Sequence, residues 1–107
     1  MKKVLILEDE VNIRSFVVIN LTRAGYEAIE AGTGQEALDR LAENPDIGVA
    51  IMGIMLPDMD GFEVCRRIRK ESNVPIILIT ARGEDFERIM GLDIGADDYI
   101  VQPFSPG

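Results

Sequence analysis

Short apolar runs alternate along this chain with segments of helical periodicity, and this alternation limits the possible folds more than any other feature. Residues 4–7 (VLIL) form a continuous apolar run that stops abruptly at three acidic residues. A short run that is apolar on both faces is typical of a buried parallel strand. Similar or weaker runs follow, so we expect strands at 4–7, 26–30, 47–53, 74–80 and 99–101.

The segments between these runs carry helix signals. Ile13, Phe16 and Leu21 fall on one helical face, and Gly25 provides a C-terminal stop. Residues 33–36 (TGQE) match a capping box at the start of a second helix. The predicted helices span residues 10–24, 34–43, 62–71 and 84–94.

Strands and helices that alternate with short connections imply right-handed crossovers and a parallel sheet covered on both faces. We therefore expect an α/β fold of the doubly wound, flavodoxin-like kind, with strand order 2-1-3-4-5 and one domain over residues 1–107. In such sheets the ligand crevice lies beyond the carboxyl ends of the strands, where the strand order reverses. Here that point falls between the first and third strands, beside Glu8, Asp9 and Gly53.

Composition narrows the class of protein. The chain has 107 residues, 47% of them hydrophobic, which suits a single globular domain. Its formal charge of −8 argues against direct nucleic-acid binding, because phosphate contacts need clustered Lys and Arg. The single Cys excludes an intramolecular disulfide framework, and no apolar run is long enough to span a bilayer or to act as a secretory signal. We expect a cytoplasmic protein with no membrane association.

Two adjacent carboxylates follow the first strand. Glu8 and Asp9 have the chemistry of a Mg²⁺ site, since this cation takes one or two carboxylates together with waters and phosphate oxygens. The alternative is structural, because acids after a strand often form a solvated loop or the first turn of a helix. Further along, Asp58 and Asp60 have the spacing of turn residues that lead into the third helix.

Four motifs occur in order at the predicted strand ends. They are residues 5–10 (LILEDE), 55–61 (MLPDMDG), 79–81 (ITA) and 95–104 (GADDYIVQPF). Together they cover essentially the whole chain, and they resemble the receiver domain of bacterial two-component response regulators. The resemblance is to receivers of regulators that carry a winged-helix DNA-binding output domain in particular.

This resemblance implies roles for individual residues. Glu8, Asp9 and the backbone carbonyl of Met55 match the protein ligands of Mg²⁺. Thr80 matches the hydroxyl residue that binds the phosphoryl group, and Tyr99 matches the aromatic switch residue.

The chain departs from the family pattern at two positions. Gly53 stands where the resemblance places the phosphate-accepting Asp, and Gln102 stands where it places an invariant Lys. A receiver needs a carboxylate nucleophile and cationic charge to stabilise the phosphoryl oxygens. We therefore expect a degenerate receiver that is not phosphorylated at the usual position and is not an enzyme. It requires no cofactor and binds Mg²⁺ only weakly.

Function is then expected to depend on protein contacts. In the family, partners bind over the region that matches residues 84–101, so the expected partner is a sensor kinase, a second receiver or an output domain. Two alternatives remain. The chain is an altered form of a normal Mg²⁺-dependent, aspartyl-phosphate-accepting receiver that regulates transcription, or it binds a small ligand in the space beside Gly53. No Gly-rich phosphate loop follows the first strand, which counts against the second alternative.

The C-terminus carries one further expectation. The resemblance implies a fifth helix after the Pro-Phe pair, whereas the sequence ends at Ser105, Pro106 and Gly107. Without that helix, an apolar face beside the first helix is left uncovered. We expect this face to be covered by self-association, by domain swapping or by a partner.

Overall fold

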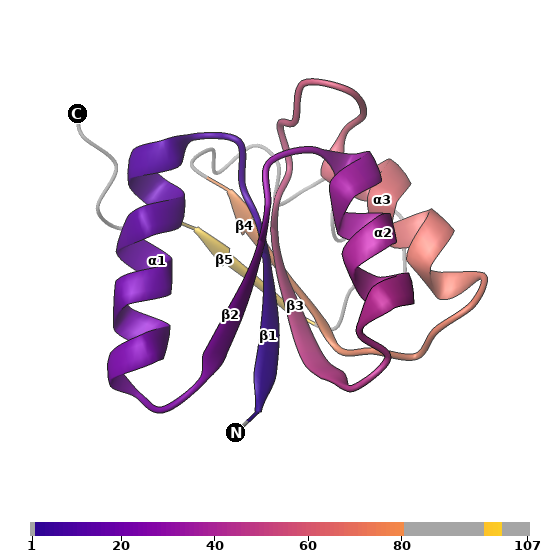
Figure 1. Ribbon diagram of the computed structural model, residues 1–107. Coiled ribbons are helices and arrows are strands. Elements are labelled where there is room, and N and C mark those ends of the chain that lie inside the picture. The colour runs from indigo at the N-terminus through magenta and orange to yellow at the C-terminus, as the bar shows by residue number, and fades with distance from the viewer. Residues whose placement is uncertain (1, 81–97, 102–107) are drawn as a thin grey trace.

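The computed structural model describes residues 2–80 and 98–101, which form a parallel sheet with helices on both faces (Figure 1). The strand order is β2-β1-β3-β4-β5, as the sequence predicts. The strands are β1 (Lys3–Leu7), β2 (Glu27–Ala31), β3 (Ile47–Gly53), β4 (Ile76–Thr80) and β5 (Asp98–Val101). This arrangement confirms the doubly wound, flavodoxin-like prediction.

The helices of the described part are α1 (Val11–Arg23), α2 (Gly34–Glu43) and α3 (Gly61–Arg69). α1 covers one face of the sheet, and α2 and α3 cover the other (Figure 1). α2 has the predicted bounds, whereas α3 ends at Arg69 rather than at residue 71. None of these described helices is long and apolar enough to cross a membrane. The helix predicted over residues 84–94 lies outside the described residues.

Local sequence explains where these helices begin and end. Thr33 Oγ1 accepts the backbone N–H of Glu36 at 3.1 Å, so the predicted capping box opens α2. Glu10 caps α1, because its carboxylate accepts the N–H of Asn12 at 3.0 Å. After α1, Gly25 adopts a φ of 91°, which residues with a side chain rarely take, and the chain turns back into β2.

The best-packed part of the core lies between the sheet and the α2–α3 face. Val4 to Leu7 of β1 are all buried, as expected for a central strand of a parallel sheet. α3 contributes Phe62, Val64, Cys65 and Ile68, all buried. Cys65 is therefore a small core residue.

Among the described residues, α1 packs on the other face of the sheet without a fully buried side chain of its own. α1 contacts β1 and β2, but none of its residues is buried. Its partly buried side chains include Ile13, Val17 and Leu21, which recur every four residues. Phe16 was expected on the same face and is instead 52% exposed. It lies about 100° around the helix from Val17, which turns it away from the sheet.

Candidate functional site

The carboxyl ends of β1, β3 and β4 bring predicted site residues to one edge of the sheet. Leu7 pairs with Met52, which places Glu8 beside Gly53. On the other side of Gly53, β4 ends at Thr80. The crevice predicted from topology therefore lies between the ends of β1 and β3.

The two predicted switch residues are placed by their backbones alone. Thr80 ends β4, and Tyr99 pairs with Leu78 in the neighbouring strand β5. Gln102 lies outside the described residues. Of the predicted partner surface over residues 84–101, the structure describes only β5, the terminal strand in the order of the sheet.

The Glu8 side chain lies against the position where residue 53 would carry a side chain. A Cβ on Gly53 would lie 2.9 Å from Glu8 Oε1, which is closer than an ordinary contact. The other oxygen, Oε2, accepts the backbone N–H of Glu10 at 2.9 Å. Because the near contact is with the far end of a flexible side chain, a small residue at position 53 requires only that Glu8 shift.

Burial raises the pKa of the Glu8 carboxyl above its ordinary value. The backbone N–H of Glu10 lowers this pKa, whereas Asp9 raises it through a hydrogen bond between the two carboxyl groups and through its charge. The Asp9 carboxyl thus opposes ionisation of Glu8, and a cation beside Glu8 would relieve this repulsion.

These two carboxyl groups supply part of a cation site. Mg²⁺ is held in proteins by one or two carboxylates with several waters, so Glu8 and Asp9 fit it as ligands. Among the described residues, no cluster of three His, Cys, Asp or Glu side chains is arranged to hold a metal ion. Met55, whose carbonyl is the third predicted ligand, lies in the next loop with its side chain 63% exposed. Two carboxylates and a backbone carbonyl are ligands that suit Mg²⁺.

Arg14 also belongs to this edge of the molecule, and the motifs gave no indication of it. Its Nη1 donates to the backbone carbonyl of Glu8 at 2.7 Å, and its Nε donates to Glu30 Oε1 at 3.1 Å. These contacts join the carboxyl ends of β1 and β2 to the beginning of α1. The available sequence signal is spacing, because Arg14 lies about one helical turn after the Glu10 cap.

The two aspartates of the β3–α3 loop have different partners. Asp60 accepts the backbone N–H of Glu63 at 2.9 Å and caps α3, in agreement with its predicted local role. Asp58 differs from the prediction, because its carboxylate accepts the N–H groups of Gly34 at 2.8 Å and Gln35 at 3.0 Å. These bonds hold the pKa of Asp58 below its ordinary value. The loop after β3 is thereby tied to the start of α2.

The same loop closes tightly over the end of β3. The N–H of Gly61 donates to the carbonyl of Ile54 at 2.6 Å. A Cβ on Gly61 would lie 2.5 Å from the carbonyl oxygen of Gly53, and a backbone atom cannot swing away as a side chain can. Position 61 therefore requires glycine for the loop to close in this way.

Comparisons with known proteins agree with this geometry. Residues 4–107 match the sequence pattern of the response regulator receiver domain. The chain is 45% identical over 106 residues to the probable transcriptional regulator ycf27 of Cyanophora paradoxa, with 98% of this chain and 44% of the relative covered. It is 43% identical over 107 residues to the alkaline phosphatase synthesis transcriptional regulatory protein PhoP of Bacillus subtilis, with 98% and 44% covered. The chain thus spans less than half the length of these relatives.

Solved structures share the fold. The response regulator TrrA from Thermotoga maritima, in complex with Mg²⁺ and BeF, has a TM-score of 0.87 at 34% identity, covering 98% of this chain and 90% of that one. The BeF₃-activated N-terminal receiver domain of RstA from Klebsiella pneumoniae has a TM-score of 0.87 at 28% identity, covering 98% and 89%. Since the family pattern matches nearly the whole chain and the sheet topology agrees with it, this chain belongs to the response regulator receiver domain family.

Proposed function

We propose that this chain is a receiver domain of two-component signal transduction whose signalling does not depend on phosphorylation of residue 53. Gly53 ends β3 at the position where the family resemblance puts the phosphate acceptor, and glycine carries no nucleophile. The Glu8 carboxylate takes up the adjacent space. The missing carboxylate at the end of β3 is the observation that carries the proposal.

The neighbouring acids that the structure describes have other roles. Glu10 caps α1, Asp60 caps α3, and Asp58 holds the first amides of α2. A phosphoryl group on any of these side chains would remove a capping interaction from a helix end. None of the three is therefore a good substitute for a carboxylate at position 53.

Output then requires protein contacts, and the chain acts as a binding module rather than as an enzyme. We place the partner surface over residues 84–101, which match the region that receivers use for partners. A sensor kinase, a second receiver or an output domain fits this surface. Relatives named as transcriptional regulators support an output domain in particular. Mg²⁺ bound at Glu8 and Asp9 is weak and is not required.

Acetyl phosphate with Mg²⁺, followed by intact-mass measurement, tests the proposal. The unsubstituted chain is expected to show no stable phosphoryl adduct. The double variant Gly53→Asp with Gln102→Lys is treated in the same way, and its outcome separates the two candidate functions. A stable adduct on the unsubstituted chain would contradict the proposal.

The alternative function is that of a phosphate-accepting receiver present in an altered form. Relatives of this chain are named as transcriptional regulators, which suits a phosphate-accepting receiver. In addition, a side chain at position 53 would meet the flexible end of Glu8 before any backbone atom. Mg²⁺-dependent phosphorylation of the double variant would show that the rest of the machinery is intact and would favour this alternative. A double variant that folds and stays unmodified would favour the degenerate receiver.

A further inference from the structure

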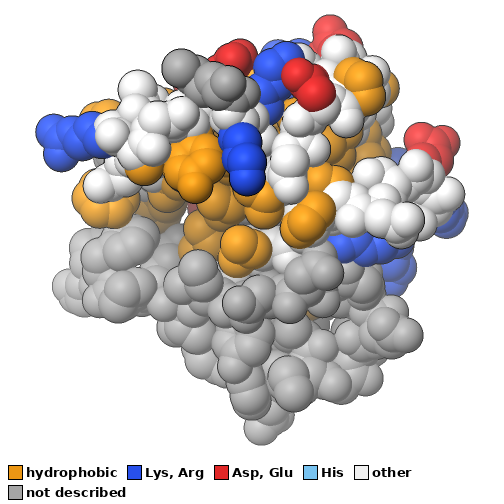
Figure 2. All heavy atoms as spheres, turned by 90° about the horizontal axis from the view of Figure 1, so that it is seen from below, with side chains coloured by type: hydrophobic (Ala, Val, Ile, Leu, Met, Phe, Trp, Pro, Cys, Tyr) orange, Lys and Arg blue, Asp and Glu red, His pale blue; other side chains and the backbone are white. Residues whose placement is uncertain are grey.

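A groove lies between the C-terminal ends of α2 and α3, at the end of the sheet opposite to Glu8 and Gly53. The strands begin at this end: Ile47 opens β3, and Val74 lies just before β4. Seen from this end, hydrophobic side chains gather in the middle of the described surface (Figure 2). The groove has a volume of about 600 Å³, and ligand pockets have volumes of roughly 300–1,000 Å³. Several aliphatic side chains of an occupant therefore fit into it.

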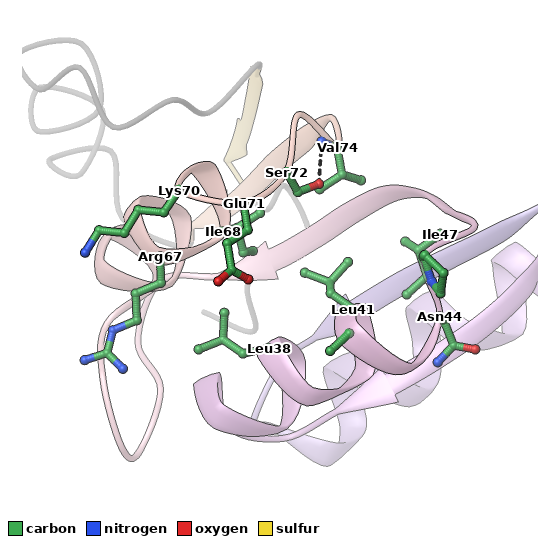
Figure 3. Close-up of a pocket in the computed structure, with 12 residues that line it drawn as sticks. Leu38, Leu41, Asn44, Ile47, Arg67, Ile68, Lys70, Glu71, Ser72 and Val74 are labelled. Carbon is green, nitrogen blue, oxygen red and sulfur yellow. Dashed lines mark hydrogen bonds between the residues drawn. The ribbon is translucent and has the colours of Figure 1, made fainter.

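The two walls of the groove differ in character. The α2 wall is apolar, because Leu38 and Leu41 are only partly buried and Ala42 is exposed. The α3 wall carries Arg67 and Lys70, whose charged ends reach outward at its rim (Figure 3). An occupant can therefore cover apolar surface on one side of the groove and meet cations on the other.

The end of α3 holds an excess of positive charge. Residues 66–70 (RRIRK) contain four of the chain's 11 Lys and Arg side chains, although the chain as a whole has a formal charge of −8. Arg66 and Arg67 share a single carboxylate, that of Glu63, at 3.4 and 3.0 Å. A helix C-terminus carries about half a negative charge, so the three arginines in the last turn of α3 more than offset it. This rim therefore attracts anionic groups.

One carboxylate limits where those anionic groups can lie. Glu71 is exposed, and Figure 3 shows its carboxylate turned toward Leu38 across the groove, whereas Arg67 and Lys70 reach away from it. An acid placed inside the groove would lie close to Glu71, and like charges repel. The best-fitting occupant therefore presents apolar side chains to the groove and acidic side chains to the rim of α3.

The cations at this rim have helical spacing. Arg66, Arg67 and Lys70 are all exposed, and Lys70 follows the two arginines by four and three residues. Side chains at these spacings are neighbours on a helix surface, about 5–6 Å apart. Acidic side chains three or four positions apart on a second helix have the same spacing. A helix with an apolar face flanked by acidic residues thus matches both the groove and its rim.

Hydrogen bonds hold the turns that border the groove. After α3, Arg69 donates to the backbone carbonyls of Ser72 at 3.3 Å and Val74 at 2.7 Å. At the end of α2, Asn44 donates its backbone N–H at 2.9 Å and its side-chain amide at 3.0 Å to the carbonyl of Arg40. Because these turns are fixed before binding, an occupant has less conformational freedom to remove.

We propose that this groove docks an amphipathic helix of a partner protein, with an apolar face flanked by acidic residues. The apolar side chains of that helix cover Leu38, Leu41 and Ala42, and its acidic side chains lie at Arg67 and Lys70. The net negative charge of the chain repels such a helix elsewhere, which restricts it to this surface. The groove involves neither position 53 nor residues 84–101, so it is a second docking surface in addition to the one proposed above.

A fluorescein-labelled synthetic helix of Leu, Glu and Ala, with its Leu residues on one face, tests the proposal. Fluorescence anisotropy of this peptide, titrated with the full chain, is expected to show saturable binding. Amide chemical shifts in NMR spectra should change over residues 38–47 and 66–74. A scrambled peptide of the same composition has no apolar face and should bind about tenfold more weakly, the loss expected when one Leu is no longer buried.

Charge substitutions test the sign of the complementarity. Arg67→Gln and Lys70→Gln should each weaken peptide binding by about three-fold, as is usual for an exposed ion pair. Arg23→Gln is the matched control, because Arg23 is also exposed in the last turn of a helix, and it should leave binding unchanged. Glu71→Gln should instead tighten binding by about three-fold, because it removes a repulsive charge.

Substitutions of Ala42 separate loss of binding from loss of folding. Ala42 lines the groove and is exposed, so Ala42→Glu and Ala42→Lys should both keep the circular dichroism spectrum of the unsubstituted chain. The two new side chains are of similar length and opposite charge. Ala42→Glu should weaken binding of the acidic peptide more strongly than Ala42→Lys does.

Four results would each overturn the proposal: absence of saturable binding, equal binding of the scrambled peptide, shift changes outside the groove, or equal effects of Arg67→Gln and Arg23→Gln. Binding of decanoate without binding of the peptide would also overturn it, because the groove would then hold a small ligand. The same applies if the chain self-associates and Ala42→Glu abolishes this, because the occupant would then be a second copy of the chain.

Discussion

Asp58, in the loop after β3, accepts the backbone N–H of Gly34 at 2.8 Å, although the two residues are 24 positions apart in the chain. A second bond from the N–H of Gln35 reaches the other carboxylate oxygen at 3.0 Å. Thr33 already accepts the N–H of Glu36 in the same turn. The start of α2 is thus capped both by its own N-cap residue and by the loop beside the candidate site. Each of these two segments therefore helps to hold the other in its folded conformation.

Replacement of Asp58 with Ala should lower the free energy of unfolding, because two amide groups at the start of α2 lose their acceptor. The bonds lower the pKa of Asp58, so its stabilisation is present above the ordinary carboxyl pKa and is lost as the pH falls through the lowered value. Urea unfolding in neutral and in strongly acidic buffer measures this. The difference in free energy of unfolding between the unsubstituted chain and D58A should be smaller in acid than at neutral pH. At neutral pH, D58N should recover part of the stability that D58A loses. An equal difference in free energy of unfolding at both pH values would rule out capping that depends on the charge of Asp58.

Gly53 and Gly61 should respond differently to the same substitution. A Cβ at position 53 meets the end of the Glu8 side chain, whereas a Cβ at position 61 meets the backbone carbonyl of Gly53 at 2.5 Å. We expect G53A to change the free energy of unfolding by less than about 1 kcal/mol. G61A should lower it by about 1–3 kcal/mol, the usual cost of overpacking. Each variant is the control for the other in denaturant unfolding, and a G61A protein as stable as the unsubstituted chain would contradict the close approach.

Local sequence patterns were enough to predict the fold class, but they could not predict hydrogen bonds between segments that are far apart in the chain. The apolar runs and the capping box at Thr33 predicted the alternation of strands and helices and the bounds of α2, because these depend on residues close together in the sequence. The strand order followed from the doubly wound fold class that this alternation indicates. The bond from Gly34 to Asp58 depends on how a loop folds back, which no periodicity encodes. Likewise, the hydrogen bond from Arg14 to the Glu8 carbonyl follows from how α1 lies on the strand ends. The site could therefore be located from sequence, but its hydrogen-bond network could not.

Replacement of Glu8 with Gln should stabilise the protein at neutral pH. Burial and the Asp9 carboxyl raise the pKa of Glu8, so the folded state holds this proton more tightly than the unfolded chain does. Ionisation of Glu8 therefore costs stability as the pH rises through the raised value. The amide in E8Q carries no charge and still accepts the N–H of Glu10.

Thermal unfolding over a pH series measures this effect. E8Q should be more stable than the unsubstituted chain at neutral pH, and this difference in stability should disappear below the ordinary Glu pKa of 4.5. E27Q removes an exposed carboxylate from β2 and should show no such advantage. If E8Q and the unsubstituted chain were equally stable at neutral pH, the raised pKa of Glu8 would be contradicted.

The exposed apolar side chains of α1 predict self-association through this helix. Val11 is 58% exposed and Ile19 is 52% exposed, and a second copy of the chain would bury both. Light scattering over a concentration series should show an apparent mass that rises with concentration. I19K should weaken the association about tenfold, which corresponds to about 1.4 kcal/mol. T22K places the same charge at an exposed polar position of α1 and should have little effect. A monomer mass at every concentration would contradict self-association, and equal effects of the two variants would assign the loss to charge rather than to the buried side chain.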